Sequence, residues 1–216
     1  MLTNEQLIAS LEDSGVLRSK RIHEALFAFP REKFVPADLV NHAYEDRPLP
    51  IGEAQTISQP YTVVFMLELL DAQPGQNVLE IGAGSGWQTA MLSYLISPLL
   101  TKEGVGGGAG HVWAYEINKA VGQFGKKNLE NAGVSVKAAQ SVHAAYAIAD
   151  ASRHWDEHEP YDRIIAGAAF SEIPDELRQL LKVGGRLVAP TQEQDVRVIE
   201  RVGQNEFDER IYPGFV

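Results

Sequence analysis

The chain has 216 residues, a formal net charge of −10 and no cysteine. The lack of cysteine excludes disulfides and thiol nucleophiles, and the acidic balance disfavours a broad surface for nucleic acid, which needs clustered lysine and arginine. No uninterrupted apolar run approaches a membrane span, and the N-terminus lacks the basic head and apolar core of a signal peptide. We therefore expect a cytoplasmic protein without nucleic acid or membrane partners, folded as a single domain over residues 1–216.

The N-terminal part is expected to be helical at first and then irregular. Thr3 followed by Gln6 indicates a capping box for a first helix, and apolar residues at helical spacing predict a second helix over 20–29. Pro30 ends that helix. The proline-punctuated segment 31–52 cannot be one regular element, so we expect an ordered connecting loop.

A polar stretch, 55–60, gives way to an amphipathic helix over 63–70. Thr56 and Ser58 stand just before this helix. Serine and threonine at such positions usually cap a helix, because their hydroxyls accept hydrogen bonds from free backbone N–H groups. The local pattern therefore favours a capping role for both residues.

The chain is organised around residues 77–89, which predict a buried strand, a glycine turn and the start of a helix. The turn has the pattern G-x-G-x-G, and glycine lets the backbone turn sharply and a ligand approach closely. The dinucleotide-binding fingerprint has its third glycine one position later, where this chain has Trp87. Trp87 therefore argues against NAD.

Glu80, at the end of the predicted strand, points to a different ligand. A carboxylate there would repel a pyrophosphate but attract a cation. S-adenosylmethionine carries an ammonium and a sulfonium and no phosphate. The stretch resembles motif I of the class I methyltransferases, and a generic strand-to-helix turn is the alternative interpretation.

A second acidic residue follows the next predicted strand. Residues 111–116 form that strand, which ends in Glu116, and Asn118 can cap the helix that follows. In a doubly wound sheet the acid that ends the second strand lies beside the ligand crevice. Glu116 is therefore expected to accept hydrogen bonds from the two ribose hydroxyls of an adenosine, with an ordinary exposed glutamate as the alternative.

Strands and helices alternate through the rest of the chain. The glycine-rich segment 101–110 predicts a flexible loop, and the alanine-rich stretch 139–155 is mostly helix-forming. We expect strands over 134–138, 161–169 and 186–190, a short helix over 174–181, and a closing antiparallel pair over 196–202 and 207–212. This alternation predicts a doubly wound, mostly parallel sheet with helices on both faces, preceded by an N-terminal helical extension.

Two motifs are set aside. The segment 154–158 matches the H-x-x-E-H pattern of inverted zinc peptidases, but that pattern needs a helix and Pro160 follows at once. Ser85 stands between two glycines without the G-x-S-x-G spacing of a hydrolase elbow. We therefore expect neither a metal site nor a serine hydrolase.

Three blocks of the sequence resemble the protein-L-isoaspartate O-methyltransferase family. They are Arg31-Glu32-Lys33-Phe34-Val35-Pro36, Ala43-Tyr44-Glu45-Asp46-Arg47-Pro48-Leu49-Pro50-Ile51-Gly52 and Gln55-Thr56-Ile57-Ser58-Gln59-Pro60-Tyr61. Residues 78–86, the strand ending at Glu116, and the segments 161–164 and 181–187 are also similar to the family, so the resemblance covers nearly the whole chain.

The resemblance implies a fold and a reaction. The fold is that of a class I methyltransferase with a seven-stranded sheet, in which 1–73 supply the N-terminal helices and active-site segment and 74–216 the cofactor-binding core. The reaction is methyl transfer from S-adenosylmethionine to the α-carboxylate of L-isoaspartyl residues in damaged proteins, a repair step. A monomer that acts on isoaspartyl-containing proteins and peptides is expected.

The resemblance also implies the roles of single residues. Ser58 falls on the family's active-site serine, and with Thr56 it is expected to hydrogen-bond the acceptor carboxylate. That carboxylate is ionised at neutral pH, so a general base is unnecessary. Glu80 is expected to hold the methionine end of the cofactor and Glu116 the ribose. Further cofactor contacts are expected from Gln55, Ile57, Gly82, Gly84, Ser85, Gly86, Ile117 and Gln140.

Two departures from the family pattern leave other functions open. The family has Gly-Asp-Gly after its third strand, with the aspartate at the adenine, and the corresponding residues here are 138–142, where Gln140 carries no charge. The chain ends at Val216, where the family's last strand continues into a Val-Pro-Leu segment. The alternatives are a catalytically inactive member that acts as a binding module, and a class I methyltransferase with a different acceptor.

Overall fold

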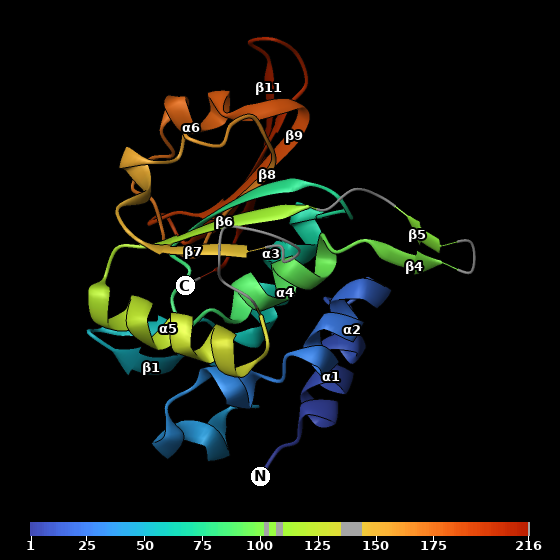
Figure 1. Cartoon of the computed structure of the whole chain (residues 1–216), viewed down its shortest axis with the longest axis vertical. Coiled ribbons are helices and arrows are strands. Elements are labelled where there is room, and N and C mark those ends of the chain that lie inside the picture. The colour runs from blue at the N-terminus through green and yellow to red at the C-terminus, as the bar shows by residue number, and fades with distance from the viewer. Residues whose placement is uncertain (102–103, 107–109, 135–143, 216) are drawn as a thin grey trace.

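The structure is a computed structural model that describes residues 1–101, 104–106, 110–134 and 144–215. A seven-stranded sheet forms its centre, in the order β11-β10-β9-β8-β3-β6-β7 (Figure 1). Neighbouring strands from β7 to β9 are parallel, and β10 and β11 are antiparallel to their neighbours. The strands are β3 (Asn77–Ile81), β6 (His111–Glu116), β7 (Ala144–Ile148), β8 (Tyr161–Ala166), β9 (Leu181–Pro190), β10 (Asp195–Arg201) and β11 (Phe207–Pro213). The predicted mostly parallel sheet with a closing antiparallel pair is confirmed.

Helices lie on both faces of this sheet. One face is covered by α3 (Pro60–Leu70), α4 (Trp87–Leu95) and α5 (Lys119–Asn131), with α1 (Asn4–Asp13) and α2 (Lys20–Ala28) packed beyond them, and the other by the short helix α6 (Asp175–Gln179). Successive residues of a strand point to opposite faces, so Val78 belongs to the first core and Leu79 to the second. None of the helices within the described residues is long and apolar enough to cross a membrane.

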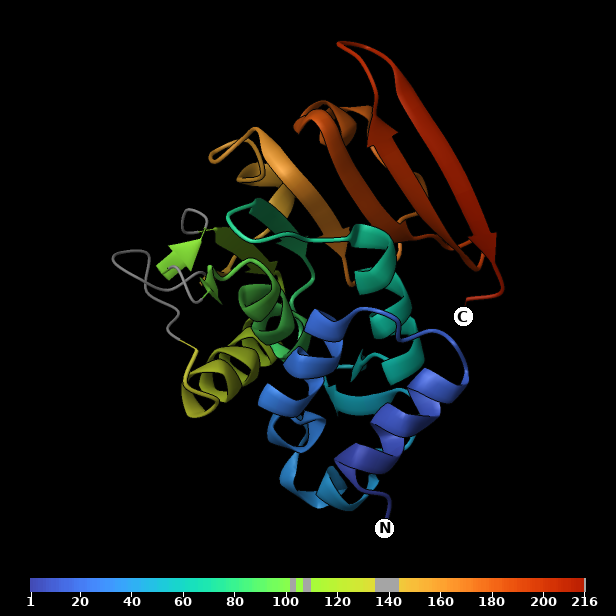
Figure 2. The same cartoon turned by 90° about the vertical axis from the view of Figure 1, so that its right-hand side faces the viewer.

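The N-terminal extension lies at one end of the molecule. Figures 1 and 2 show α1 and α2 (blue) at the opposite end from the antiparallel strands (orange to red), with α3 between them. The predicted capping box is confirmed, because the Thr3 hydroxyl accepts from the Gln6 N–H and the Gln6 side chain from the Thr3 N–H. The predicted cap of α5 is also confirmed, since the Asn118 side chain accepts from two backbone N–H groups.

At the start of α3 the capping prediction is wrong. The N-cap of this helix is Gln59, whose side chain makes no capping hydrogen bond, and Pro60 is its first residue. Residues Gln55–Ile57 form the strand β2, which pairs antiparallel with β1 (Leu49–Gly52) and places Thr56 ahead of the cap position. The carboxylate of Asp46 instead accepts from the Tyr61 N–H at 2.8 Å. A distant acid therefore takes over the role expected of the local hydroxyls.

Two connecting segments contain more regular structure than predicted. The segment 31–52 holds the 3-10 helices η1 (Arg31–Phe34) and η2 (Ala37–His42) before β1. Within the glycine-rich loop, β4 (Leu99–Thr101) and β5 (Gly104–Gly106) pair antiparallel. Short local pairing thus replaces part of the expected flexible loop.

The prediction that 139–155 is mostly helical is wrong for the described residues of this stretch. Ala144–Ile148 form β7, which pairs parallel with β6, and only the short 3-10 helix η3 (Ala151–Arg153) follows. Buried Ala144 and Tyr146 alternate with more exposed neighbours, as a strand at a sheet edge requires. Tertiary pairing therefore overrides the helix propensity of alanine. Most of the predicted strand 134–138 lies outside the described residues.

Candidate functional site

The glycine turn between β3 and α4 is fixed against the adjacent strand β6. The N–H groups of Gly82 and Ala83 both donate to the carbonyl of Tyr115, at 2.9 and 3.0 Å. Gly86 has φ of +83°, and a Cβ there would lie 2.8 Å from the Cγ of Leu129 in α5. Both the conformation and the space at this position therefore require glycine.

Two polar side chains also donate hydrogen bonds to backbone carbonyls of this turn. The Tyr146 hydroxyl of β7 donates to the Gly84 carbonyl at 2.8 Å, and the Asn128 amide of α5 donates to the Ser85 carbonyl at 3.1 Å. Both side chains come from elements far along the chain, so no local motif indicated them. They rigidify the backbone that faces the cavity described below.

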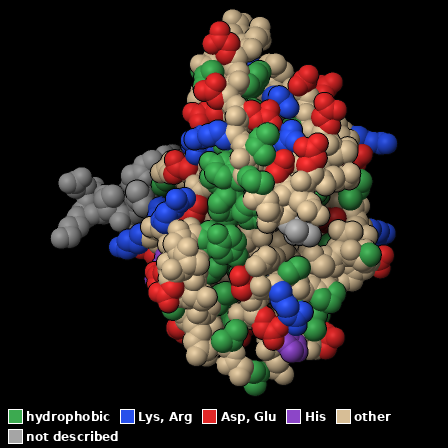
Figure 3. Space-filling model, turned by 180° about the vertical axis from the view of Figure 1, so that it is seen from behind, with side chains coloured by type: hydrophobic (Ala, Val, Ile, Leu, Met, Phe, Trp, Pro, Cys, Tyr) green, Lys and Arg blue, Asp and Glu red, His purple; other side chains and the backbone are tan. Residues whose placement is uncertain are grey.

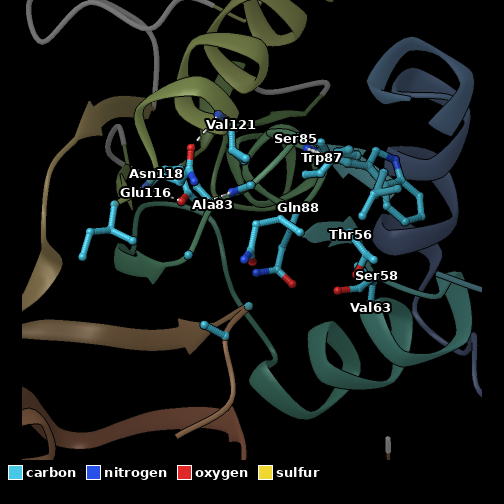
Figure 4. Close-up of a pocket in the computed structure, with 18 residues that line it drawn as sticks. Thr56, Ser58, Val63, Ala83, Ser85, Trp87, Gln88, Glu116, Asn118 and Val121 are labelled. Carbon is cyan, nitrogen blue, oxygen red and sulfur yellow. Dashed lines mark hydrogen bonds between the residues drawn. The ribbon is translucent and has the colours of Figure 1, made fainter. Parts of the chain in front are cut away.

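Glu116 lies at the end of β6, next to this turn. Its Oε2 accepts from the Gly84 N–H at 2.9 Å and its Oε1 from the Asn118 N–H at 2.8 Å (Figure 4). The side chain is largely buried but lines the cavity, and the neighbouring Ile117 is 70% exposed. Each carboxylate oxygen keeps further acceptor capacity, so the group can receive donors from a ligand without giving up its backbone partners.

Glu80, which is expected to hold the methionine end of the cofactor, does not line the cavity. Its side chain is fully buried, with Oε2 accepting from the Thr89 hydroxyl at 2.6 Å and Oε1 from the Gln88 amide at 3.1 Å. Burial in this apolar surrounding raises the pKa of the Glu80 carboxyl to about 7, against the lowering effect of the two hydrogen bonds. Gln88, not Glu80, reaches the cavity.

The segment that carries Thr56 and Ser58 lies across the cavity from Glu116. Figure 4 shows the two hydroxyl residues together on one side, Glu116 and Asn118 on the other, and Gln88 between them. Neither hydroxyl has a hydrogen-bond partner within the described part of the chain, and both residues line the cavity. Both hydroxyls are therefore available to a ligand.

The cavity gathers most of the predicted site residues. It is lined by Gln55, Thr56, Ile57, Ser58, Gly82, Gly84, Ser85, Glu116 and Ile117. Its wall is completed by Ile51, Val63, Ala83, Trp87, Gln88, Asn118, Val121, Gly167 and Ala168. Of the remaining predicted residues, Glu80 and Gly86 support the wall from behind, and Gln140 lies outside the described residues.

Asp150 is not among the predicted site residues, yet it lies beside the cavity. It lies two residues after the end of β7, and the intervening Ala149 N–H donates to the Glu116 carbonyl at 2.9 Å. Hydrogen bonds from the Ser152 hydroxyl and N–H lower the pKa of the Asp150 carboxyl. The strand beside β6 is therefore followed by Ala149-Asp150-Ala151, whereas residues 138–142, expected to correspond to the family's Gly-Asp-Gly, lie outside the described residues. Only the pairing of β7 with β6 marks this position, because the alanine-rich sequence before Asp150 did not predict a strand.

Asp150 borders an apolar slot that opens from the main cavity. Gly82, Ile117 and Ala168 line both spaces. The rest of the slot is lined by Ile81, Tyr115, Ala149, Asp150, Ala151, Ser152, Trp155 and Phe170. An apolar slot with an acid at its edge suits a flat heterocycle that carries hydrogen-bond donors.

The H-x-x-E-H segment has a different environment. His154 contacts Glu157, with Nδ1 and Oε1 2.7 Å apart, and the His158 ring stacks on Trp113 at a centroid distance of 3.3 Å. The segment is a series of turns, and no group of three or more potential metal ligands gathers among the described residues.

The sheet order, the glycine turn and the acid at the end of β6 together have the arrangement of the class I methyltransferase fold. A solved Plasmodium falciparum protein-L-isoaspartate O-methyltransferase in complex with S-adenosyl-L-homocysteine has the same fold, with a TM-score of 0.79 and 20% sequence identity over 100% of this chain and 98% of that chain.

Sequence comparison gives the family. The model of the protein-L-isoaspartate(D-aspartate) O-methyltransferase family matches residues 2–212. A protein-L-isoaspartate O-methyltransferase from Staphylothermus marinus is 38% identical over 205 residues, which are 94% of this chain and 86% of the relative. One from Hyperthermus butylicus is 40% identical over 185 residues, or 86% and 73% of the two chains. The chain belongs to the protein-L-isoaspartate O-methyltransferase family.

Proposed function

We propose that this chain transfers a methyl group from S-adenosylmethionine to the α-carboxylate of L-isoaspartyl residues in proteins and peptides, and so takes part in protein repair. The observation that carries the proposal is the single cavity that has the hydroxyls of Thr56 and Ser58 on one side and Glu116 with the glycine turn on the other. Family membership supports the same reaction.

The donor side of the cavity fits S-adenosylmethionine. When bound, this cofactor supplies an electrophilic methyl group on a sulfonium. Glu116 has acceptor capacity for the ribose hydroxyls, and the slot beside Ile117 and Asp150 suits the adenine ring. Gln88, held by Glu80, faces the space between the two sides and offers its amide to the methionine end. The negative charges of the site favour a cationic donor.

The acceptor side needs to position its substrate and not to activate it. A peptide α-carboxylate is ionised at neutral pH, so it attacks without a general base. Ser58 and Thr56 can each donate one hydrogen bond to such a carboxylate. Attack on the sulfonium consumes one negative and one positive charge, so alignment and partial exclusion of water are what the protein contributes.

A methylation assay tests this proposal. Incubation with radiolabelled S-adenosylmethionine should label a peptide that contains L-isoaspartate and leave the matching aspartyl peptide unlabelled. Equal labelling of the two peptides would reveal a different acceptor. Absence of labelling, together with no detectable binding of S-adenosylhomocysteine in a calorimeter, would instead favour a binding module.

The role of Ser58 is tested separately with Ser58→Ala. Since Ser58 faces the acceptor side, we expect turnover of the isoaspartyl peptide to fall about tenfold or more, as for loss of one hydrogen bond to a charged group. The affinity for S-adenosylhomocysteine should stay the same. Unchanged turnover would contradict the proposed hydrogen bond from Ser58 to the acceptor carboxylate.

We further propose that the protein acts as a cytoplasmic monomer without nucleic acid or membrane partners. The net charge of −10 supports the absence of a nucleic-acid surface. On the face seen in Figure 3, basic and acidic side chains are interspersed and do not form a basic patch. Light scattering of the purified protein tests the monomer, and a dimer mass would reject it.

A further inference from the structure

Arg31 is a buried cation that forms no salt bridge within the described residues. Its side chain has 0% exposure, and no acidic side chain of the described residues lies within ion-pair distance of it. Desolvation lowers the pKa of its guanidinium to about 10, against the raising effect of the nearby Asp46 carboxylate. A buried charge of this kind is tolerated only where hydrogen bonds replace its water. The residues that supply those hydrogen bonds therefore identify what Arg31 holds.

The guanidinium donates to five main-chain carbonyls. Nη1 donates to Ala43 and Glu45 at 2.8 and 3.3 Å, and Nη2 donates to Arg47, Ile57 and Ser58 at 3.0, 3.3 and 2.9 Å. Three of these carbonyls belong to the connection before β1. The other two belong to the end of β2 and to the residue that carries the proposed acceptor hydroxyl. Arg31 thus ties the acceptor segment to a separate part of the chain.

The same connection also holds the acceptor segment from its other end. The carboxylate of Asp46 accepts from the Gln59 side chain at 3.1 Å and from the Tyr61 N–H at 2.8 Å. Ser58 therefore lies between two anchor points, the Arg31 guanidinium before it and the Asp46 carboxylate after it. The two anchors fix the backbone of the acceptor segment on both sides of the hydroxyl.

Arg31 also contacts the donor side of the cavity. Its guanidinium carbon lies 5.5 Å from the centroid of the Trp87 ring, within cation–π range. Trp87 is the first residue of α4, lines the cavity, and donates from its indole nitrogen to the Phe29 carbonyl at 2.9 Å. One buried side chain therefore contacts both the acceptor segment and the residue that follows the glycine turn.

We propose that Arg31 is a positioning residue for methyl transfer, which sets the placement of the Ser58 backbone relative to the glycine turn. The planar guanidinium holds Nη1 and Nη2 in a rigid fork that spans these carbonyls, while its buried Nε has no hydrogen-bond partner among the described residues; lysine offers its donors from one point and cannot span the same carbonyls. Displacement of a reacting group by about 1 Å can cost about a hundredfold in rate. This inference rests on the proposed function, because it concerns the same reaction.

The variants Arg31→Met and Arg31→Lys test it, with Arg21→Met as the matched control. Arg21 also donates to three carbonyls, those of Tyr94, Leu95 and Ser97, and lies 5.3 Å from the Tyr94 ring centroid. Tyr94 and Leu95 end α4, Ser97 follows its C-cap residue, and none of the three lines the cavity. Arg21→Met therefore removes a comparable anchor at a place remote from the acceptor.

We expect kcat/KM for the isoaspartyl peptide to fall by about 30-fold or more in both Arg31 variants and to change less than about threefold in Arg21→Met. The dissociation constant of S-adenosylhomocysteine, measured by calorimetry, should change less than about threefold in all three variants. The midpoint of thermal unfolding is measured for each variant to show how much stability the substitution removes. Activities are then compared at a temperature well below all three midpoints, where every variant is folded.

Two results would overturn the inference. Equal loss of kcat/KM in the Arg31 and Arg21 variants would show a general effect of destabilisation. Failure of both Arg31 variants to bind S-adenosylhomocysteine would show a purely structural role. If the unmodified protein does not methylate the isoaspartyl peptide, the proposed function itself is rejected. An assay of the unmodified protein beside the variants therefore separates failure of the proposed function from failure of the inference about Arg31.

Discussion

Replacement of Glu80 by glutamine removes a carboxyl that the fold keeps out of water. The side chain is fully buried and is contacted by the Thr89 hydroxyl and the Gln88 amide. Glutamine has the same length and one carbonyl oxygen, so it fills the space and accepts one of the two hydrogen bonds. It cannot ionise. The variant therefore isolates the effect of the titratable proton.

The sign and size of the effect follow from the raised pKa. In the unfolded chain the carboxyl ionises near its ordinary pKa of 4.5, whereas in the folded protein it stays protonated up to about pH 7. Below pH 4.5 both states are protonated. As the pH rises from 4.5 to 7, ionisation stabilises only the unfolded chain. At about 1.4 kcal/mol per pH unit, the free energy of unfolding should fall by about 3 kcal/mol relative to the variant.

Urea denaturation of Glu80→Gln and the unmodified protein measures this difference. Both proteins are unfolded at several pH values across and beyond the range 4.5 to 7, and the difference between their free energies of unfolding is plotted against pH. Other titrating groups cancel in the difference, and equal m-values check that the same surface unfolds. A difference that is constant across this range would refute the reasoning, because Glu80 would then ionise at its ordinary pKa in the folded state.

Two further predictions concern the turn and the ribose acceptor. Glu116→Gln replaces one of two accepting oxygens by a donor, so we expect the affinity for S-adenosylhomocysteine to fall about tenfold or more in calorimetry, and an unchanged affinity would contradict the proposed role. Gly86→Ala forces a Cβ to within 2.8 Å of Leu129 at a φ of +83°, so we expect a loss of about 2 kcal/mol or more in urea denaturation. Gly133→Ala is the control, because its φ of +79° is similar but no atom lies within 4 Å, and an equal loss in both variants would remove the packing argument.

Much of the fold and part of the site could be predicted from local patterns. The glycine turn and Glu116 follow from an apolar run that ends in characteristic residues, and the rule that strand ends meet at one edge of a parallel sheet brings them together. Ser58 could not be found in this way. Its local pattern indicated a helix cap, and only the resemblance to a family marked it as a site residue.

The features that were missed depend on contacts between distant parts of the chain. Ala144–Ile148 is rich in alanine, and its pairing with β6 decides that it is a strand. Once that strand is placed, Asp150 lies just beyond its end, next to the residue that bonds the Glu116 carbonyl, whereas Gln140 lies outside the described residues. The burial of Glu80 depends on α4 packing over it, so its raised pKa and its separation from the cavity could not be seen in the sequence.

The sheet brings together the acids near the ends of its neighbouring strands, Glu80, Glu116 and Asp150. Burial and hydrogen bonding then determine the protonation of Glu80 and Asp150. Asp150 is held in its charged form by hydrogen bonds from Ser152, while Glu80 is driven towards its neutral form by desolvation. A cationic donor in the cavity favours the ionised form of Glu80, so its binding offsets part of the desolvation of that carboxyl. A buried acid that lowers the stability of the free protein near neutral pH is therefore consistent with a site that binds a positively charged cofactor, because the two charges stabilise each other in the complex.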